Sequence, residues 1–275
     1  LGLESEVRVY DSNLATILKK VQTDYNLDPA YVNRRIIGLP DETRLKDEND
    51  NLWSKVTYDY DEEDFQEETN QIISPIRHDT TNYGSSFIVG RGNRTSVTRH
   101  DVLTQSSAVT SRTRYDIAGS VVAKLDPLER KVRLEYTDVF NDTGTSRNTF
   151  AYPTKVYDPL GNYSQVKYRF DIGANVWAKS PAPENNTTGK ETERLYDSIG
   201  RLSKETIVNN GAYTRYDYPA NGVQSQSWTT LVDVDGDANI IEDEVYSESW
   251  SDGAGRVRRS RTEHPGSTGG YSGSL

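Results

Sequence analysis

The sequence has 275 residues, enough for one large domain or two ordinary ones. Its 32 basic and 42 acidic residues give a net charge of −10, which excludes general nucleic-acid binding because that binding depends on neutralising phosphates. There is no cysteine, so disulfides and cysteine-based metal or nucleophile sites are excluded, and no apolar run of about 18 residues could span a membrane.

The composition favours strands over helices. Hydrophobic residues make up 33% of the chain, and tyrosine outnumbers phenylalanine 18 to 5. Such a chain builds sheets whose tyrosines bury an aromatic ring and keep a hydroxyl at the wet edge. The sequence contains no methionine and starts without a signal peptide, so we expect it to be a processed or excised piece of a longer protein.

Three regions follow one another along the chain. Residues 1–29 form an N-terminal segment that we predict to be strand-rich, although the spacing within 14–25 also allows a helix. Residues 30–262 carry repeated hairpin signals, with loops predicted at 79–95, 140–149 and 180–191. Residues 263–275 form a Gly/Ser-rich tail.

The repeated phrase is an aspartate followed three residues later by glycine, often after a tyrosine. Its complete copies are Asp116 with Gly119, Asp158 with Gly161, Asp197 with Gly200, and Asp252 with Gly255. Aspartate opens a turn by bonding the backbone beyond it, and glycine accepts the positive φ that closes the turn. Two altered copies put Asp50 and Glu129 in the glycine place, and there we expect wider turns.

Repeat spacing sets the fold class. Tyrosines recur 21 residues apart at Tyr115, Tyr136 and Tyr157, and 20 apart at Tyr196 and Tyr216. A period of this length indicates a repeat architecture, and a lone hairpin is marginally stable in water. The sequence therefore predicts an all-β fold of tandem antiparallel hairpins that form one continuous, spiralling or stacked sheet.

The phrases "LYDSIGRLSKE", "VYDPLGN" and "GLPDETRLKDENDNLWSKVTYDYD" resemble the RHS/YD-repeat family over roughly residues 30–262. The resemblance implies a long spiral of β-hairpins. In that family the spiral forms hollow shells around bacterial toxin domains, and related shells serve as cell-surface adhesion modules. The family's terminal self-cleavage segment is not recognisable here, and a full shell needs several times more repeats.

One stretch has the rhythm of a calcium loop. In "DVDGDANIIEDE" Asp233, Asp235 and Asp237 occupy positions 1, 3 and 5, and Glu244 occupies position 12. Position 6 is Ala238 in place of the usual glycine, and Asp235-Gly236 is a hairpin turn signal in its own right. Calcium is thus a possible ligand, and no other cofactor is expected.

Charge is concentrated in two segments. An acidic segment contains Asp61, Glu62, Glu63 and Asp64, and a basic segment contains Arg256, Arg258, Arg259 and Arg261. Each can be a solvated face, or the two can be complementary contacts between subunits.

No catalytic constellation emerges, since the three histidines lack metal spacing and no G-x-S-x-G elbow exists. We expect a structural, non-catalytic building block of an extracellular bacterial filament or shell, whose partners are copies of itself or further repeats of the same polypeptide. The alternatives are a cell-surface adhesin or glycan-binding module using Trp177 or Trp228, and a shell fragment enclosing a toxin domain.

Overall fold

A computed structural model describes residues 2–62, 75–103, 107–138, 149–183, 188–220, 222–230, 244–263 and 271–274. Over these residues the chain is all-β, with 18 antiparallel strands in one open sheet, which confirms the predicted fold class. The described residues up to Gly161 form one compact unit, unit 1, and those from Asn162 onward form another, unit 2.

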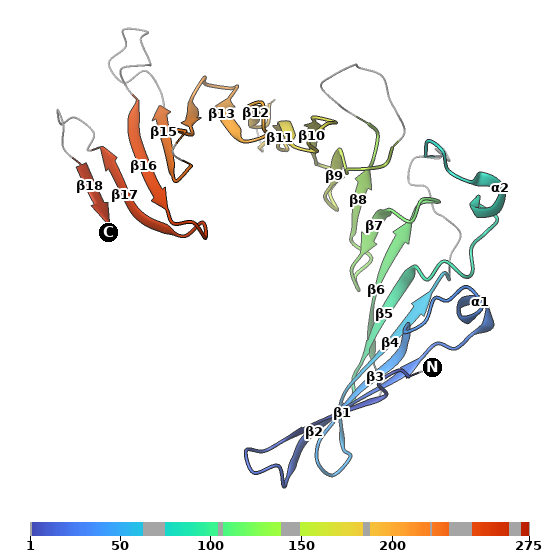
Figure 1. Cartoon of the computed structure of the whole chain (residues 1–275). Helices are drawn as coiled ribbons and strands as arrows, with labels where there is room; N and C mark the ends of the chain where they lie inside the picture. The colour runs from blue at the N-terminus through green and yellow to red at the C-terminus, as the bar shows by residue number, and fades with distance from the viewer. Residues whose placement is uncertain are drawn as a thin grey trace. The chain divides into compact units, whose positions relative to one another are not determined.

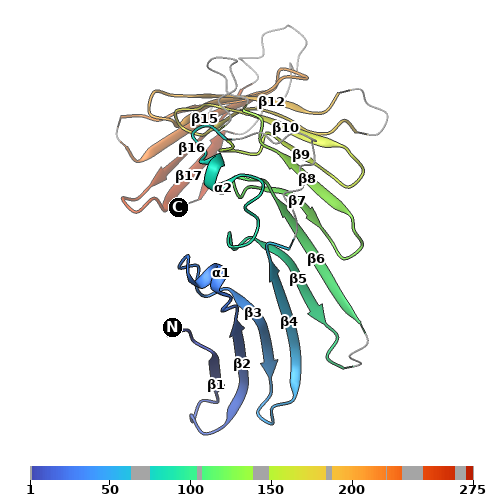
Figure 2. The same ribbon diagram turned by 90° about the vertical axis from the view of Figure 1, so that its right-hand side faces the viewer.

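In unit 1 each strand pairs antiparallel with the next strand along the chain, from β1 to β9 (Figures 1 and 2). The strands are β1 (Glu6–Tyr10), β2 (Ile17–Tyr25), β3 (Pro40–Lys46), β4 (Leu52–Tyr60), β5 (Arg94–His100), β6 (Ala108–Tyr115), β7 (Val121–Leu125), β8 (Lys131–Glu135) and β9 (Lys155–Tyr157).

Unit 2 repeats this order from β10 to β18. Its strands are β10 (Tyr163–Tyr168), β11 (Asn175–Lys179), β12 (Glu191–Tyr196), β13 (Leu202–Ile207), β14 (Tyr213–Asp217), β15 (Gln224–Thr230), β16 (Val245–Ser251), β17 (Val257–Glu263) and β18 (Tyr271–Ser274).

Two one-turn helices lie on the same side of unit 1 (Figure 1). Asp28 caps α1 (Pro29–Val32), and Asp79 caps α2 (Thr80–Tyr83). Residues 79–95, predicted as a loop, thus begin with a helical turn, because the Asp79 carboxylate accepts the backbone N–H of Asn82. In the described part of the chain, neither helix is long and apolar enough to cross a membrane.

Burial in both units is shallow. Among the described residues, the buried apolar side chains are Tyr31, Ile117, Ala123, Leu125, Val176, Ala212 and Tyr213. Polar side chains instead bond across neighbouring strands. Arg44 of β3, for example, pairs with Asp24 of β2 at 2.5 Å, and Lys55 of β4 pairs with Glu42 of β3 at 2.6 Å. Cross-strand pairs of this kind are the unit of stabilisation in a sheet that has little core.

The turns share one geometry. At Asp197 the carboxylate oxygen Oδ1 accepts the backbone N–H groups of Ile199 and Arg201 at 3.0 and 2.8 Å, and the backbone N–H of Asp197 donates to the Arg201 carbonyl. Gly200 lies between them at φ +86°. The glycines of the other three complete copies have φ values of +83°, +89° and +78°.

The expectation of wider turns at the altered copies is wrong. Asp50 and Glu129 adopt φ values of +67° and +58° and keep the same backbone bonds as a glycine there. The left-handed conformation costs an L-residue about 1–2 kcal/mol. Bonds from the Asp47 and Asp126 carboxylates to the turn backbone offset that cost.

We predict opposite outcomes for two glycines of one turn. Gly255 has φ +78° and Gly253 does not have a positive φ, while an added Cβ meets no atom within 4 Å at either position. Gly255→Ala should lower the free energy of unfolding by about 1–2 kcal/mol. Gly253→Ala should leave it unchanged or raise it by about 0.4–1 kcal/mol. Denaturant unfolding measures both, and equal effects would contradict the assigned turn geometry.

Candidate functional site

Tyrosine hydroxyls connect neighbouring strands at one end of the sheet. In unit 1 the hydroxyl of Tyr60, at the end of β4, donates to the Pro40 carbonyl at the start of β3 at 2.8 Å. Further bonds of this form run from Tyr25 to Glu4, Tyr115 to Arg94, Tyr136 to Val121 and, in unit 2, Tyr196 to Asn175 and Tyr218 to Leu202. We call these six tyrosines, with their acceptor carbonyls, the tyrosine rim.

Each junction of the tyrosine rim joins three strands. Leu202, at the start of β13, pairs with Tyr196 of β12 at a β-bulge. Its carbonyl also accepts the hydroxyl of Tyr218, which directly follows β14. Pro40, Arg94, Val121 and Asn175 likewise pair with the preceding tyrosine at a bulge. The tyrosine rim therefore ties each hairpin to the strand before it, a role that the repeat spacing alone did not reveal.

Burial raises the pKa of four of the rim tyrosines, Tyr60, Tyr115, Tyr136 and Tyr218. The pKa of Tyr60 rises to about 12 because its ring and hydroxyl are desolvated, with Arg94 opposing the shift. Desolvation also raises the pKa of Tyr115, Tyr136 and Tyr218. The neutral hydroxyl is the form that donates the hydrogen bond, so the tyrosine rim requires protonated tyrosines.

Asp61 closes a turn whose two halves are far apart in the sequence. It follows Tyr60, and its backbone N–H donates to the Asn93 carbonyl at 2.9 Å. Its carboxylate accepts the backbone N–H groups of Gly90, Arg91, Gly92 and Asn93 at 2.9–3.1 Å. Gly92, at φ +78°, occupies the glycine place of a complete copy, with Gly90 and Arg91 before it, so residues 62–89 are an insertion in a repeat turn.

Arg91 fixes this split turn to its surroundings. Its guanidinium donates to the carbonyls of Phe87 at 2.7 Å, Ile117 at 2.6 Å and Tyr83 at 2.5 Å. Burial lowers the pKa of Arg91, partly opposed by Asp61 and Asp116. A ring of backbone N–H groups such as 90–93 is an anion site, but the Asp61 carboxylate fills it, so no phosphate site is present there.

The predicted subunit-contact residues have separate surroundings. Asp61 is only 6% exposed and its carboxylate is bonded within unit 1, so it offers little surface for the predicted subunit contact. Glu62 accepts the Thr95 hydroxyl at 3.1 Å, and Glu63 and Asp64 lie outside the described residues. In the sequence, the only sign of this pairing is that Tyr60-Asp61 and Gly92-Asn93 match the two ends of the phrase "YDPLGN".

Most arginines of the predicted basic segment have partners inside unit 2. Arg256 pairs with Asp252 at 2.7 Å, and Arg261 pairs with the buried Glu248. Arg259 lies over the Trp250 ring at 4.9 Å, and Arg258 is exposed. The described acidic residues lie in unit 1 and the basic residues lie in unit 2, so neither unit by itself brings the two segments together.

The calcium prediction falls mostly outside the described residues, which exclude Asp233, Asp235 and Asp237. Glu244 bonds to Arg215 at 2.6 and 2.7 Å and accepts the Tyr213 hydroxyl at 2.6 Å. Both of its carboxylate oxygens thus have partners, and a bound cation at Glu244 would have to displace them. Elsewhere among the described residues, no three acidic or histidine side chains gather as a metal site.

The tryptophans proposed to stack on glycans are in contact with cations. The Arg215 guanidinium lies 4.0 Å from the centre of the Trp228 ring, and the Lys167 ammonium lies 4.8 Å from that of Trp177. Trp228 also packs against Tyr246 at 5.2 Å. These rings are used for cross-strand packing.

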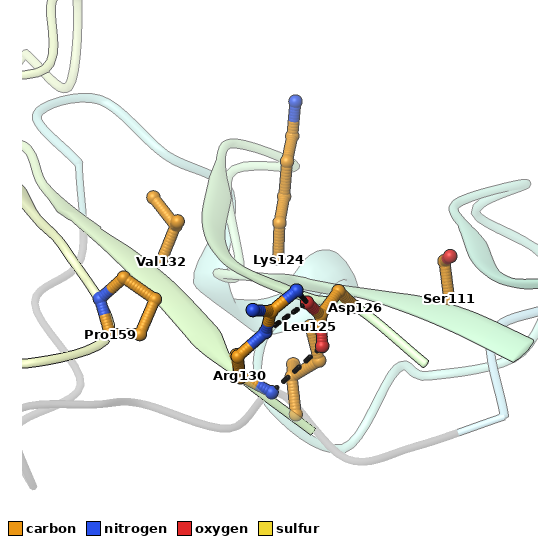
Figure 3. A pocket seen from close by; sticks show the side chains of 7 residues that line it. All are labelled: Ser111, Lys124, Leu125, Asp126, Arg130, Val132 and Pro159. Atoms are coloured by element: carbon orange, nitrogen blue, oxygen red, sulfur yellow. Dashed lines mark hydrogen bonds and ion pairs between the residues drawn. The ribbon is translucent and has the colours of Figure 1, made fainter. Parts of the chain in front are cut away.

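A surface hollow of about 350 Å³ lies by the β7–β8 turn and Pro159. Figure 3 shows Lys124 and Leu125 pointing in opposite directions, with the bonded pair Arg130 and Asp126 between them. The polar groups of this hollow do not converge on one point, which a catalytic site requires.

No family model matches the chain, and no curated protein matches it. Among solved structures, it is similar to the crystal structure of TcdB2-TccC3-Cdc42 (TM-score 0.37, 8% identity, 98% of this chain, 14% of that chain). It is also similar to the crystal structure of TcdB2-TccC3 (0.39, 8%, 94%, 13%) and to the Photorhabdus luminescens Tc holotoxin pore (0.33, 18%, 94%, 14%). The chain spans about a seventh of the length of those chains.

We predict that Tyr60→Phe lowers the free energy of unfolding by about 1 kcal/mol at neutral pH, because the Pro40 carbonyl loses its donor. The raised folded pKa of Tyr60 stabilises the fold below pH 10, and that contribution is lost as the pH rises through about 12. Wild-type stability should therefore fall more steeply than that of Tyr60→Phe over this range. Tyr83→Phe, which alters a 42% exposed ring, is the control, and equal losses for both variants would contradict the role of the tyrosine rim.

Two turn aspartates should respond oppositely to Asp→Asn. Desolvation raises the pKa of the Asp197 carboxyl, but bonds from the Arg201 backbone and guanidinium and from Ile199 outweigh it, so the pKa is lowered. Burial raises the pKa of Asp116, which has Ser120 in the place of Arg201 and whose Oδ2 is buried without a hydrogen-bond partner.

Asp197→Asn should therefore lower the thermal midpoint, by more at pH 7 than at pH 3. Asp116→Asn should leave the thermal midpoint equal or higher at pH 7. Because the folded pKa of Asp116 is raised, the wild-type fold loses stability as the pH rises and this carboxyl ionises, and asparagine does not ionise. Thermal melts across this pH range measure both variants, and a loss for Asp116→Asn matching that for Asp197→Asn would contradict the assignment.

Proposed function

We propose that this chain is a structural, non-catalytic segment of the wall of a larger shell built from Tyr-Asp hairpin repeats. The observation that supports this most directly is the single layer of strands joined by the tyrosine rim. Figures 1 and 2 show one layer in unit 1. Among the described elements, strands contact only neighbours in the sheet.

Surface area supports a role within an assembly. Val7, Val109 and Val156 are 44%, 51% and 37% exposed on their strands. A sheet with this much exposed apolar surface gains stability when other protein covers it.

The charged groups support a structural role over catalysis. Asp116 and Asp197 accept backbone N–H groups within their turns, and Arg91 donates to the Ile117 carbonyl. In unit 2, Glu244 bonds to Arg215 and Glu248 bonds to Gln224. Each is used by the sheet itself. Arg215 lies over the Trp228 ring and Lys167 lies over the Trp177 ring. These contacts use the ring faces that a glycan would need, which favours the wall over the glycan-binding alternative.

The test is to image the particle that contains this chain. We expect cryo-electron microscopy of a tagged, natively purified assembly to show the chain as a curved, one-layer sheet within a wall of similar strands. Recovery of the tagged protein as a compact monomer with no larger particle would contradict the proposal.

A further inference from the structure

Three leucines lie at the tips of successive turns of unit 1, at the end of the sheet opposite the tyrosine rim. Leu103 follows β5, Leu128 follows β7 and Leu160 follows β9, and the antiparallel order of β5 to β9 puts these three turns at the same end. The three residues are 91%, 73% and 88% exposed. Turns that are two strands apart lie about 10 Å from each other. We call these three side chains the leucine row.

The turn fixes the position of each leucine but does not require its side chain. The backbone N–H of each leucine donates to a carboxylate oxygen of the turn aspartate two residues earlier, at 2.9–3.0 Å. Asn49 holds the same place in the β3–β4 turn and makes the same bond to Asp47, so a polar side chain suits the turn equally well. A row of exposed apolar side chains that the fold does not require indicates a contact with other protein.

We propose that the leucine row binds the leucine row of a second copy of the chain. The inference rests on the wall role and gives the wall a contact between turn tips. Two identical rows have identical spacing, so each leucine of one copy meets a leucine of the other. Such a contact is isologous, the kind on which two-fold dimers are built. With full overlap of the rows, two-fold symmetry places the two copies of the central Leu128 opposite each other.

The charges beside the row favour a second copy over a strongly charged partner. Arg130 pairs with Asp126 at 2.6 Å within the β7–β8 turn, and Arg112 of β6 pairs with Glu129 of the same turn. The turn that carries Leu128 therefore presents balanced charge, although the chain as a whole has a net charge of −10. Like charges that face each other across an interface oppose association, and balanced pairs at the contact avoid this repulsion.

The test compares two glutamate variants of the full chain by sedimentation velocity over a concentration series. The wild type should associate as its concentration rises. Leu128→Glu should sediment as a single copy at the same concentrations, because association would desolvate two carboxylates that face each other. Ile199→Glu is the matched control. Ile199 also lies two residues after a turn aspartate and is 72% exposed, but it belongs to the rim end of unit 2, so this variant should associate like the wild type.

A second measurement keeps the test decisive if a glutamate variant fails to fold. Both side chains are largely exposed within one copy, so substitutions there should leave the thermal midpoint unchanged. The chain has no cysteine, so Leu128→Cys and Ile199→Cys each carry a single thiol. A short bifunctional maleimide should join Leu128→Cys into dimers and leave Ile199→Cys as single copies.

Two results overturn the proposal. The first is a wild type that stays a single copy at all concentrations. The second is an equal effect of the two sites, either in sedimentation or in cross-linking, which would indicate that the leucine row meets the rim end of unit 2 or that the copies associate without a defined site. Imaging of the native particle decides the wall role separately, so the failure of this inference and the failure of the wall role are distinguishable.

Discussion

The hydrogen bond from a tyrosine hydroxyl to a backbone carbonyl of the neighbouring strand is the interaction on which the rest of the structure depends. A one-layer sheet cannot bury a thick core, so it needs other means to hold successive hairpins in register. The Tyr60 hydroxyl bonds to Pro40, and Pro40 in turn pairs with Tyr25. Each junction thereby fixes three strands, and the aspartate that follows several of these tyrosines closes the turn to the next strand.

Desolvation explains why tyrosine suits this place. The ring covers part of the sheet and the hydroxyl satisfies a carbonyl at a bulge, where the regular ladder of backbone bonds is interrupted. Phenylalanine would leave the carbonyl without its donor. Six of the 18 tyrosines in the sequence meet this requirement.

The sequence predicted the fold class and the glycine turns, because period, turn residues and alternation are local signals. It did not predict the hydroxyl bonds, since their acceptors are backbone carbonyls that no side-chain pattern marks. It did not reveal the turn at Asp61 either, because the turn partner, Gly92, is separated from Asp61 by an insertion. The wider turns expected at Asp50 and Glu129 were wrong because aspartate bonds offset the cost of a left-handed residue there.

Native-state amide hydrogen exchange tests the central claim most directly. The amides of Asn93 and Ser120 bond to turn aspartates at the rim end of unit 1, and those of Asn51 and Arg130 make the same bond at the opposite end. If the tyrosine rim holds the sheet together, the rim-end amides exchange more slowly, at the rate of global unfolding. Equal exchange at both ends, or faster exchange at the rim end, would contradict it.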